Sequence, residues 1–306
     1  MLPPVSEQPS FRPWREAMTA ALYGPDGFFV RELPRSHFLT SSTSGPLFAV
    51  AIRRLAGRVD DALDRPDPFE VVDLGAGGGE LLAALPDVPA RWRLTAVEAA
   101  DPWPVEVHGL VMAHELLDNV PLDVTFDGQL VEVAANGTER LGAAAPSELL
   151  AWSDLWWPRS RRVEVGIARD HAWERVVGSV RRGLALAVDY GHTATDRRTS
   201  LTGYVDGHQV APIPDGSRDL TAHVAVDSCA AATGARLLVQ RAALSLLGIH
   251  AAAPDRRLAD TDPRGYLQLL QESRSASQLL APRGMGSFSW LVQPIGIADP
   301  LTDFPA

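Results

Sequence analysis

The sequence predicts an α/β protein built around a mainly parallel sheet. Apolar runs of strand length alternate along the chain with segments of helical periodicity, which is typical of repeated β-α-β units. The apolar runs lack the polar alternation of half-exposed strands, and this indicates a sheet covered on both faces. With 306 residues and 46% hydrophobic side chains, the chain is long and apolar enough to bury such a core.

The first half of the chain opens with two predicted helices, over residues 13–22 and 45–63, where apolar side chains recur with helical spacing. Pro13 suits the first turn of the earlier helix, because the N–H that proline lacks would have no partner there. One helix at 79–85 then lies among three strands, expected at 69–74, 91–98 and 109–113. Residues 124–134 are expected to form two strands joined by a hairpin turn at 126–129.

In the second half, helices and strands alternate around one long polar stretch. Residues 193–218 contain several Gly, Pro and Asp residues and are predicted to form a loop of the kind that carries functional side chains. Helices are expected at 168–182, 222–233, 241–247 and 263–280, with a helix or loop at 152–157. Strands are expected at 162–165, 183–190, 236–239 and 288–292. We therefore expect an N-terminal helical extension, residues 1–62, packed on a core domain, residues 63–306, with insertions near 190–218 and 250–283.

The charge balance and the single cysteine argue against several classes of protein. The chain has no lysine, and its arginines and acidic residues give a net charge of 28 − 38 = −10, which suits general nucleic-acid binding poorly. Cys229 alone cannot form an intramolecular disulfide or a cysteine-rich metal site. The N-terminus has no basic segment followed by an apolar run, and no apolar stretch reaches the roughly 20 residues of a membrane span. We expect a soluble, cytoplasmic protein without nucleic-acid partners or membrane insertion.

The strongest motif is Val71-Val-Asp-Leu-Gly-Ala-Gly-Gly-Gly-Glu80, where a predicted strand meets a predicted helix. Its glycines let the backbone approach a ligand without interference from a side chain. A dinucleotide fingerprint would need its third glycine at position 80, where Glu80 would instead face a pyrophosphate. An acidic residue two positions before the first of several glycines matches S-adenosylmethionine (SAM) binders. We assign cofactor binding to four residues of this motif, Asp73, Gly75, Gly77 and Gly79.

Two further strand ends carry polar side chains. Glu98 closes the strand at 91–98, where a carboxylate can accept hydrogen bonds from both ribose hydroxyls; an ordinary surface glutamate is the alternative. His114, Glu115 and Asp118 follow the strand at 109–113, which borders the transferred methyl group in this architecture. In a helical turn, two carboxylates three residues apart share a face, so they could clamp a cationic guanidinium and orient it for attack on the sulfonium methyl. Helix capping with surface charge is the alternative.

The histidines near residue 220 allow a third interpretation. Asp219 and His223 are four residues apart and could form an oriented pair at the start of the helix at 222–233, with His223 as a later proton acceptor. The three histidines at positions 192, 208 and 223 lie too far apart in sequence to form a local metal-binding motif, so we expect no metal. A Ser-His-Asp hydrolase would need a Gly-x-Ser-x-Gly elbow, which the sequence lacks.

These segments, in this order, resemble the MidA family of SAM-dependent methyltransferases, which includes the mitochondrial complex I assembly methyltransferase. The likeness spans nearly the whole chain, through stretches at 21–29, 37–41, 72–79, 114–121, 163–165, 188–192, 219–224 and 285–288. It implies a class I methyltransferase fold, Rossmann-like, with added helical segments. It also implies methyl transfer to an arginine side chain of a protein substrate, in the mitochondrial members a respiratory complex I subunit. By this resemblance Gly75, Gly77 and Glu98 bind the cofactor, and Glu115 and Asp118 border the methyl group.

Departures from the family pattern, among them one at His114, and two other hypotheses accompany this assignment. His114 stands where the family usually has asparagine, and we group it with the cofactor-binding residues, whereas Glu115, Asp118 and His223 form the catalytic group. A SAM-binding assembly or interaction factor without catalysis is the main alternative. A nicotinamide-dependent oxidoreductase is the weaker one, because Glu80 breaks its fingerprint. The oligomeric state stays open, with a dimer among the options.

Overall fold

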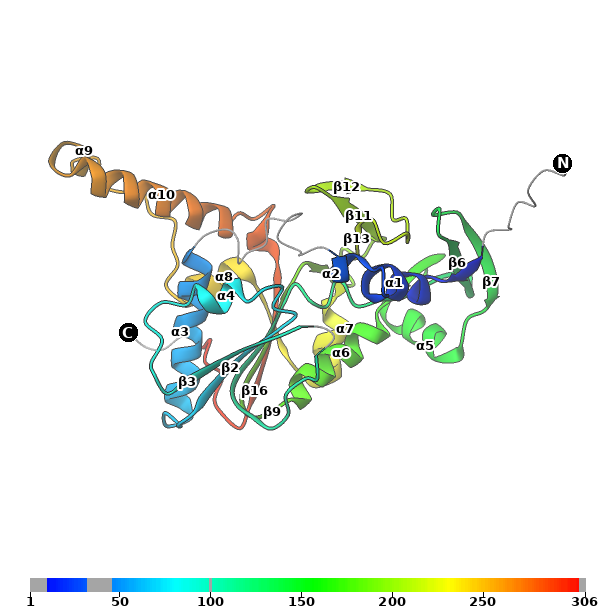
Figure 1. Ribbon diagram of the computed structural model, residues 1–306, viewed down its shortest axis with the longest axis horizontal. Helices are drawn as coiled ribbons and strands as arrows, with labels where there is room; N and C mark the ends of the chain where they lie inside the picture. The colour runs from blue at the N-terminus through cyan, green and yellow to red at the C-terminus, as the bar shows by residue number, and fades with distance from the viewer. Residues whose placement is uncertain (1–9, 32–45, 99–100, 303–306) are drawn as a thin grey trace. The chain divides into compact units, whose positions relative to one another are not determined.

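The computed structural model describes residues 10–31, 46–98 and 101–302 (Figure 1). The described chain divides into two compact units, each made of separate stretches of sequence. The large unit comprises residues 46–98, 101–118, 170–193 and 224–302, and the small unit comprises residues 10–31, 119–169 and 194–223. The division expected at residues 62 and 63 stays a prediction about chain organisation. One stretch of the family resemblance, residues 37–41, lies outside the described residues.

The large unit is built on a six-stranded sheet, and the predicted mainly parallel arrangement is confirmed. Its strands, in spatial order, are β15 (Arg236–Val239), β16 (Ser289–Ile295), β9 (Val180–Asp189), β4 (Val107–His114), β2 (Phe69–Leu74) and β3 (Trp92–Val97). The pairings among β9, β4, β2 and β3 are parallel, whereas β16 runs antiparallel to both of its neighbours. Five strands therefore point the same way and their carboxyl ends share one edge of the sheet.

Helices cover both faces of this sheet (Figure 1). On one face, α3 (Pro46–Ala62) turns a stripe of side chains three and four residues apart toward the strands, namely Phe48, Ile52, Leu55 and Val59. This stripe shares one core with strand residues such as Leu110 and Leu186, and with buried residues of α8 (Gln240–Leu246) and α10 (Pro263–Leu279). The other large-unit elements are α4 (Glu80–Ala83), β10 (Gly191–His192), β14 (Val224–Ala225), α7 (Val226–Thr233), α9 (Leu258–Thr261) and a 3₁₀ turn at Met285–Ser287. The helix α6 (Ile167–Gly178) begins in the small unit and ends in the large one.

The small unit contains two antiparallel sheets. The first has five strands, β1 (Phe11–Pro13), β6 (Gln129–Ala134), β5 (Asp123–Phe126), β8 (Arg162–Val165) and β7 (Glu139–Ala144). The second has three, β12 (His208–Val210), β11 (Thr202–Val205) and β13 (Asp219–Thr221). The helices of this unit are α1 (Trp14–Tyr23), α2 (Phe28–Arg31) and α5 (Ser147–Trp156). Trp14 of α1 packs in one core with strand residues Val124, Val131 and Val133.

Two predictions about the stretch before α7 were wrong. Residues 193–218 are not a plain loop, because β11 pairs with both β12 and β13. Asp206 and Gly207 both have positive φ and form the two-residue turn between β11 and β12, a hairpin signal present in the sequence. The helix expected from residue 222 begins at Val226, since the preceding residues pair as β13 and β14. No helix within the described segments is long and apolar enough to cross a membrane.

Candidate functional site

The glycine loop follows β2 directly and lies wholly in the large unit. Gly75, Gly77, Gly78 and Gly79 have φ values of 72°, 60°, 123° and 79°, in the region that side chains disfavour. The Gly75 N–H donates to the carbonyl of Val97 on β3 at 2.7 Å. A Cβ on Gly75 would lie 2.8 Å from Cδ1 of Leu116, so glycine permits this close approach. The loop is thereby packed against the segment that follows β4.

Three carboxyl groups surround this loop. Asp73, near the end of β2, is 3% exposed, and its pKa is raised to about 7, first by burial and then by the neighbouring Glu98 and Glu80. Glu98, exposed just after β3, accepts a hydrogen bond from the Gly78 N–H at 3.3 Å. The arrangement suits a ligand that carries positive charge and opposes a pyrophosphate.

The segment from Glu115 to Asp118, called the acidic turn below, is not helical, so the predicted sharing of a helix face was wrong. Glu115 has a φ of 51°, outside the helical region. The reason is non-local: the Glu115 N–H donates to the carbonyl of Val188 at 2.8 Å. The N–H groups of Leu117 and Asp118 donate to the carboxylate of Asp189 at 2.9 and 3.2 Å. The end of β9 therefore shapes this turn.

The two carboxylates of the acidic turn differ in environment. Asp118 is 3% exposed and accepts a short hydrogen bond from the hydroxyl of Tyr190. Glu115 is half-buried, and its Oε1 lies 3.3 Å from Nε2 of His114. Burial lowers the pKa of His114 to about 4, so this contact joins a carboxylate to a neutral imidazole at pH 7. The ring of His114 also packs on Phe48, with 5.0 Å between ring centroids.

The cofactor candidates and the acidic turn thus come together at the carboxyl ends of adjacent parallel strands. The loop after β2, Glu98 after β3 and His114 to Asp118 at the end of β4 all lie at this edge of the large unit. Ligands of open α/β sheets bind at such an edge. These residues carry signals in the sequence, whereas no role was expected for Asp189 and Tyr190. Two polar residues at the end of an otherwise apolar strand were the signal for them.

His223 belongs to the small unit. The pKa of its imidazole is lowered by burial and by the nearby charges of Arg198 and Arg169, and the backbone N–H of His223 donates to Oγ of Ser200 at 2.9 Å. Asp219 and His223 do not lie at a helix start as expected, because α7 begins only at Val226; Asp219 lies in β13, where its carboxylate accepts a hydrogen bond from the Asn119 side chain at 2.8 Å. Within residues 10–31, 46–98 and 101–302, no group of three or more His, Cys, Asp or Glu side chains is arranged to hold a metal ion.

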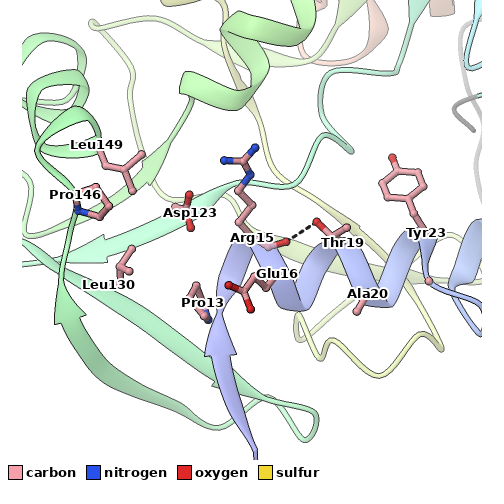
Figure 2. Close-up of a pocket in the computed structure, with 11 residues that line it drawn as sticks. Pro13, Arg15, Glu16, Thr19, Ala20, Tyr23, Asp123, Leu130, Pro146 and Leu149 are labelled. Carbon is pink, nitrogen blue, oxygen red and sulfur yellow. Dashed lines mark hydrogen bonds between the residues drawn. The ribbon is translucent and has the colours of Figure 1, made fainter. Parts of the chain in front are cut away.

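The small unit also has a cavity of about 600 Å³ between α1, β5 and the start of α5 (Figure 2). The side chains of Arg15, Glu16 and Asp123 bring charge to walls that are otherwise largely apolar. Burial raises the pKa of Asp123, whereas the charge of Arg15 acts in the opposite direction. None of the residues predicted for the site lines this cavity.

Comparison with known proteins agrees with the geometry of the large unit. Residues 86–241, half of the chain, match the family described as "Putative S-adenosyl-L-methionine-dependent methyltransferase". No curated protein matches. A COG1565 superfamily member from Burkholderia thailandensis, solved with S-adenosyl-homocysteine bound, is 22% identical, with 95% of this chain and 90% of that chain covered and a TM-score of 0.72. An uncharacterized COG1565 superfamily protein from the same organism is 21% identical, with 95% and 89% covered and a TM-score of 0.74. The predicted class I methyltransferase fold is confirmed.

Proposed function

The chain belongs to the SAM-dependent methyltransferase family, and we propose that it transfers the methyl group to an arginine side chain of a protein substrate. The observation that carries this proposal is the pair of acidic neighbourhoods at the ends of β2 and β4, which meet where Gly75 packs on Leu116. One neighbourhood suits the cationic cofactor and the other suits a cationic acceptor. The resemblance to the MidA family implies that the acceptor is an arginine of a protein substrate. In the mitochondrial members this substrate is a complex I subunit.

We assign the cofactor to the glycine loop. The residues fit this group, because the loop offers backbone without side chains and is surrounded by carboxyl groups that favour a cation. The bound S-adenosyl-homocysteine of the Burkholderia structure supports the same assignment. When bound, SAM supplies an electrophilic methyl group on a sulfonium. Glu98 would hold the ribose hydroxyls, and Gly75, Gly77 and Gly79 would face the methionine part. Asp73 and His114 complete the proposed cofactor-binding residues.

We assign the acceptor to the acidic turn. An arginine is protonated in water, so its attacking nitrogen must be oriented with its charge balanced, and a proton must eventually leave. Glu115 and Asp118 are suited to hold a guanidinium, because carboxylates form paired, charge-assisted hydrogen bonds with it. His223, whose pKa is lowered first by burial, stays our sequence-based candidate for the later proton acceptor.

Two isosteric substitutions test the acceptor site. Glu115→Gln and Asp118→Asn should leave the affinity for S-adenosyl-homocysteine, measured by calorimetry, within a few-fold of the parent. Transfer of labelled methyl from SAM to the proteins of a bacterial lysate should fall by about 10² or more, because alignment of the acceptor is lost. Acid hydrolysis of the labelled protein should release methylarginine. Glu174→Gln, an exposed glutamate on α6, is the matched control and should retain the parent rate.

The possible outcomes separate the competing functions. If the label appears on another amino acid, the arginine assignment is wrong and methyl transfer stands. If both variants transfer methyl at the parent rate, the acidic turn does not hold the acceptor. A parent protein that binds S-adenosyl-homocysteine but methylates nothing would favour the assembly factor without catalysis.

A further inference from the structure

The last residues of β9 and the residue after it hold the acidic turn through four hydrogen bonds. Val188 accepts the Glu115 N–H, Asp189 accepts the N–H groups of Leu117 and Asp118, and Tyr190 donates its hydroxyl to the Asp118 carboxylate. We propose that Asp189 and Tyr190 are positioning residues for methyl transfer, which fix the backbone and the carboxylate of the acidic turn. This inference rests on the proposed function of that turn.

The acidic turn needs such support because its own backbone provides little. It is too short and irregular to hold itself by helical hydrogen bonds, and Glu115 has a φ of 51°, which is unfavourable for a side-chain-bearing residue. A turn of this kind keeps one conformation only where its surroundings impose it. Asp189, itself 1% exposed, provides a buried carboxylate for two consecutive N–H groups of the turn.

Tyr190 is itself held from two sides. Its carbonyl accepts the Val224 N–H at 3.1 Å, where β14 pairs with β10. Its ring packs on Phe288, with ring centroids 5.6 Å apart. The hydroxyl therefore reaches Asp118 from a fixed ring, and the Asp118 carboxylate keeps one orientation. Orientation matters here, because displacing a reacting group by about 1 Å can slow a reaction about 10²-fold.

Tyr190→Phe is the most selective test, because it keeps the ring contact with Phe288 and removes only the hydroxyl. We expect methyl transfer from labelled SAM to lysate proteins to fall at least 10-fold in turnover, with the affinity for S-adenosyl-homocysteine within two-fold of the parent. The melting temperature should change little, since the ring packing stays. Tyr266→Phe on α10 is the matched control and should keep the parent turnover. At position 189, Ala should lose turnover, whereas Asn, which retains an acceptor oxygen, should recover most of it.

A double variant shows whether Tyr190 acts through Asp118. Tyr190→Phe combined with Asp118→Asn should be no slower than Asp118→Asn alone, because the hydroxyl has no carboxylate left to orient. Losses that multiply would overturn the inference, as would a parent turnover for Tyr190→Phe beside a slow Asp118→Asn. A Tyr190→Phe variant that loses both its melting temperature and its cofactor affinity would also overturn it, in favour of a purely structural role. If Asp118→Asn itself transfers methyl at the parent rate, it is the proposed function that fails.

Discussion

Replacing Asp73 with asparagine tests the electrostatics of the glycine loop directly. Burial, followed by the charges of Glu98 and Glu80, raises the pKa of this aspartate from 3.8 to about 7 in the folded protein. The native state therefore binds the proton more tightly than the unfolded chain does. The resulting stabilisation is fully present below about pH 4 and is lost as the pH rises to about 7. A gap of about 3 pKa units, at about 1.36 kcal/mol each, corresponds to about 4 kcal/mol of unfolding free energy.

Asp73→Asn cannot ionise and should lack this pH dependence. Urea unfolding of the variant and the parent near pH 4 and near pH 8 measures this pH dependence, because the two proteins share all other titrating groups. The cost of burying the asparagine amide is the same at both pH values and therefore cancels. From pH 4 to pH 8, the unfolding free energy of the parent should fall by about 4 kcal/mol relative to that of the variant. Glu98→Gln, which removes one of the two neighbouring charges, should reduce the effect without abolishing it. The same difference between variant and parent at both pH values would refute the reasoning.

Three further predictions concern folding. Gly75→Ala should lower the unfolding free energy by about 2 kcal/mol, because alanine disfavours the left-handed φ and its Cβ meets Leu116; Gly178→Ala, which meets nothing within 4 Å, is the control and should cost little. Glu164→Gln should destabilise the small unit by about 2–3 kcal/mol in urea unfolding, since this buried carboxylate accepts hydrogen bonds from three donor groups of residues 200–201. Arg169→Met should cost about 3 kcal/mol or more by the same measurement, because three backbone carbonyls lose their buried donor; an unchanged free energy would show that water replaces it.

The part of the site that local sequence determines could be predicted. The β2 strand and the glycines after it carry their own signals, since a mostly apolar run ends at consecutive positive-φ positions that glycine tolerates best. The same holds for β4 and for the amphipathic α3, whose stripe of core residues is visible in the sequence. The position of Glu98 followed from the end of a strand, and the structure places it beside the loop, at Gly78.

The part that depends on distant residues could not be predicted. The spacing of Glu115 and Asp118 suggested a helical turn, but hydrogen bonds from residues about 70 positions away impose another conformation. The pairing of β11 with β13 likewise joins strands separated by a polar stretch, and only the Asp206-Gly207 turn hinted at a hairpin. The raised pKa of Asp73 also requires tertiary structure, because burial is its largest cause.

The interleaving of the two units has a consequence for limited proteolysis. The chain passes from one unit to the other between the described residues 31 and 46, and again after residues 118, 169, 193 and 223. A protease that cut once, for example after residue 169, would leave β4 in one fragment and β9 in the other, and these two strands are hydrogen-bonded neighbours. Both fragments would also retain parts of each unit. Such a nicked protein should migrate as one species under native conditions and as two in denaturant, and neither unit can be obtained by trimming the chain from one end.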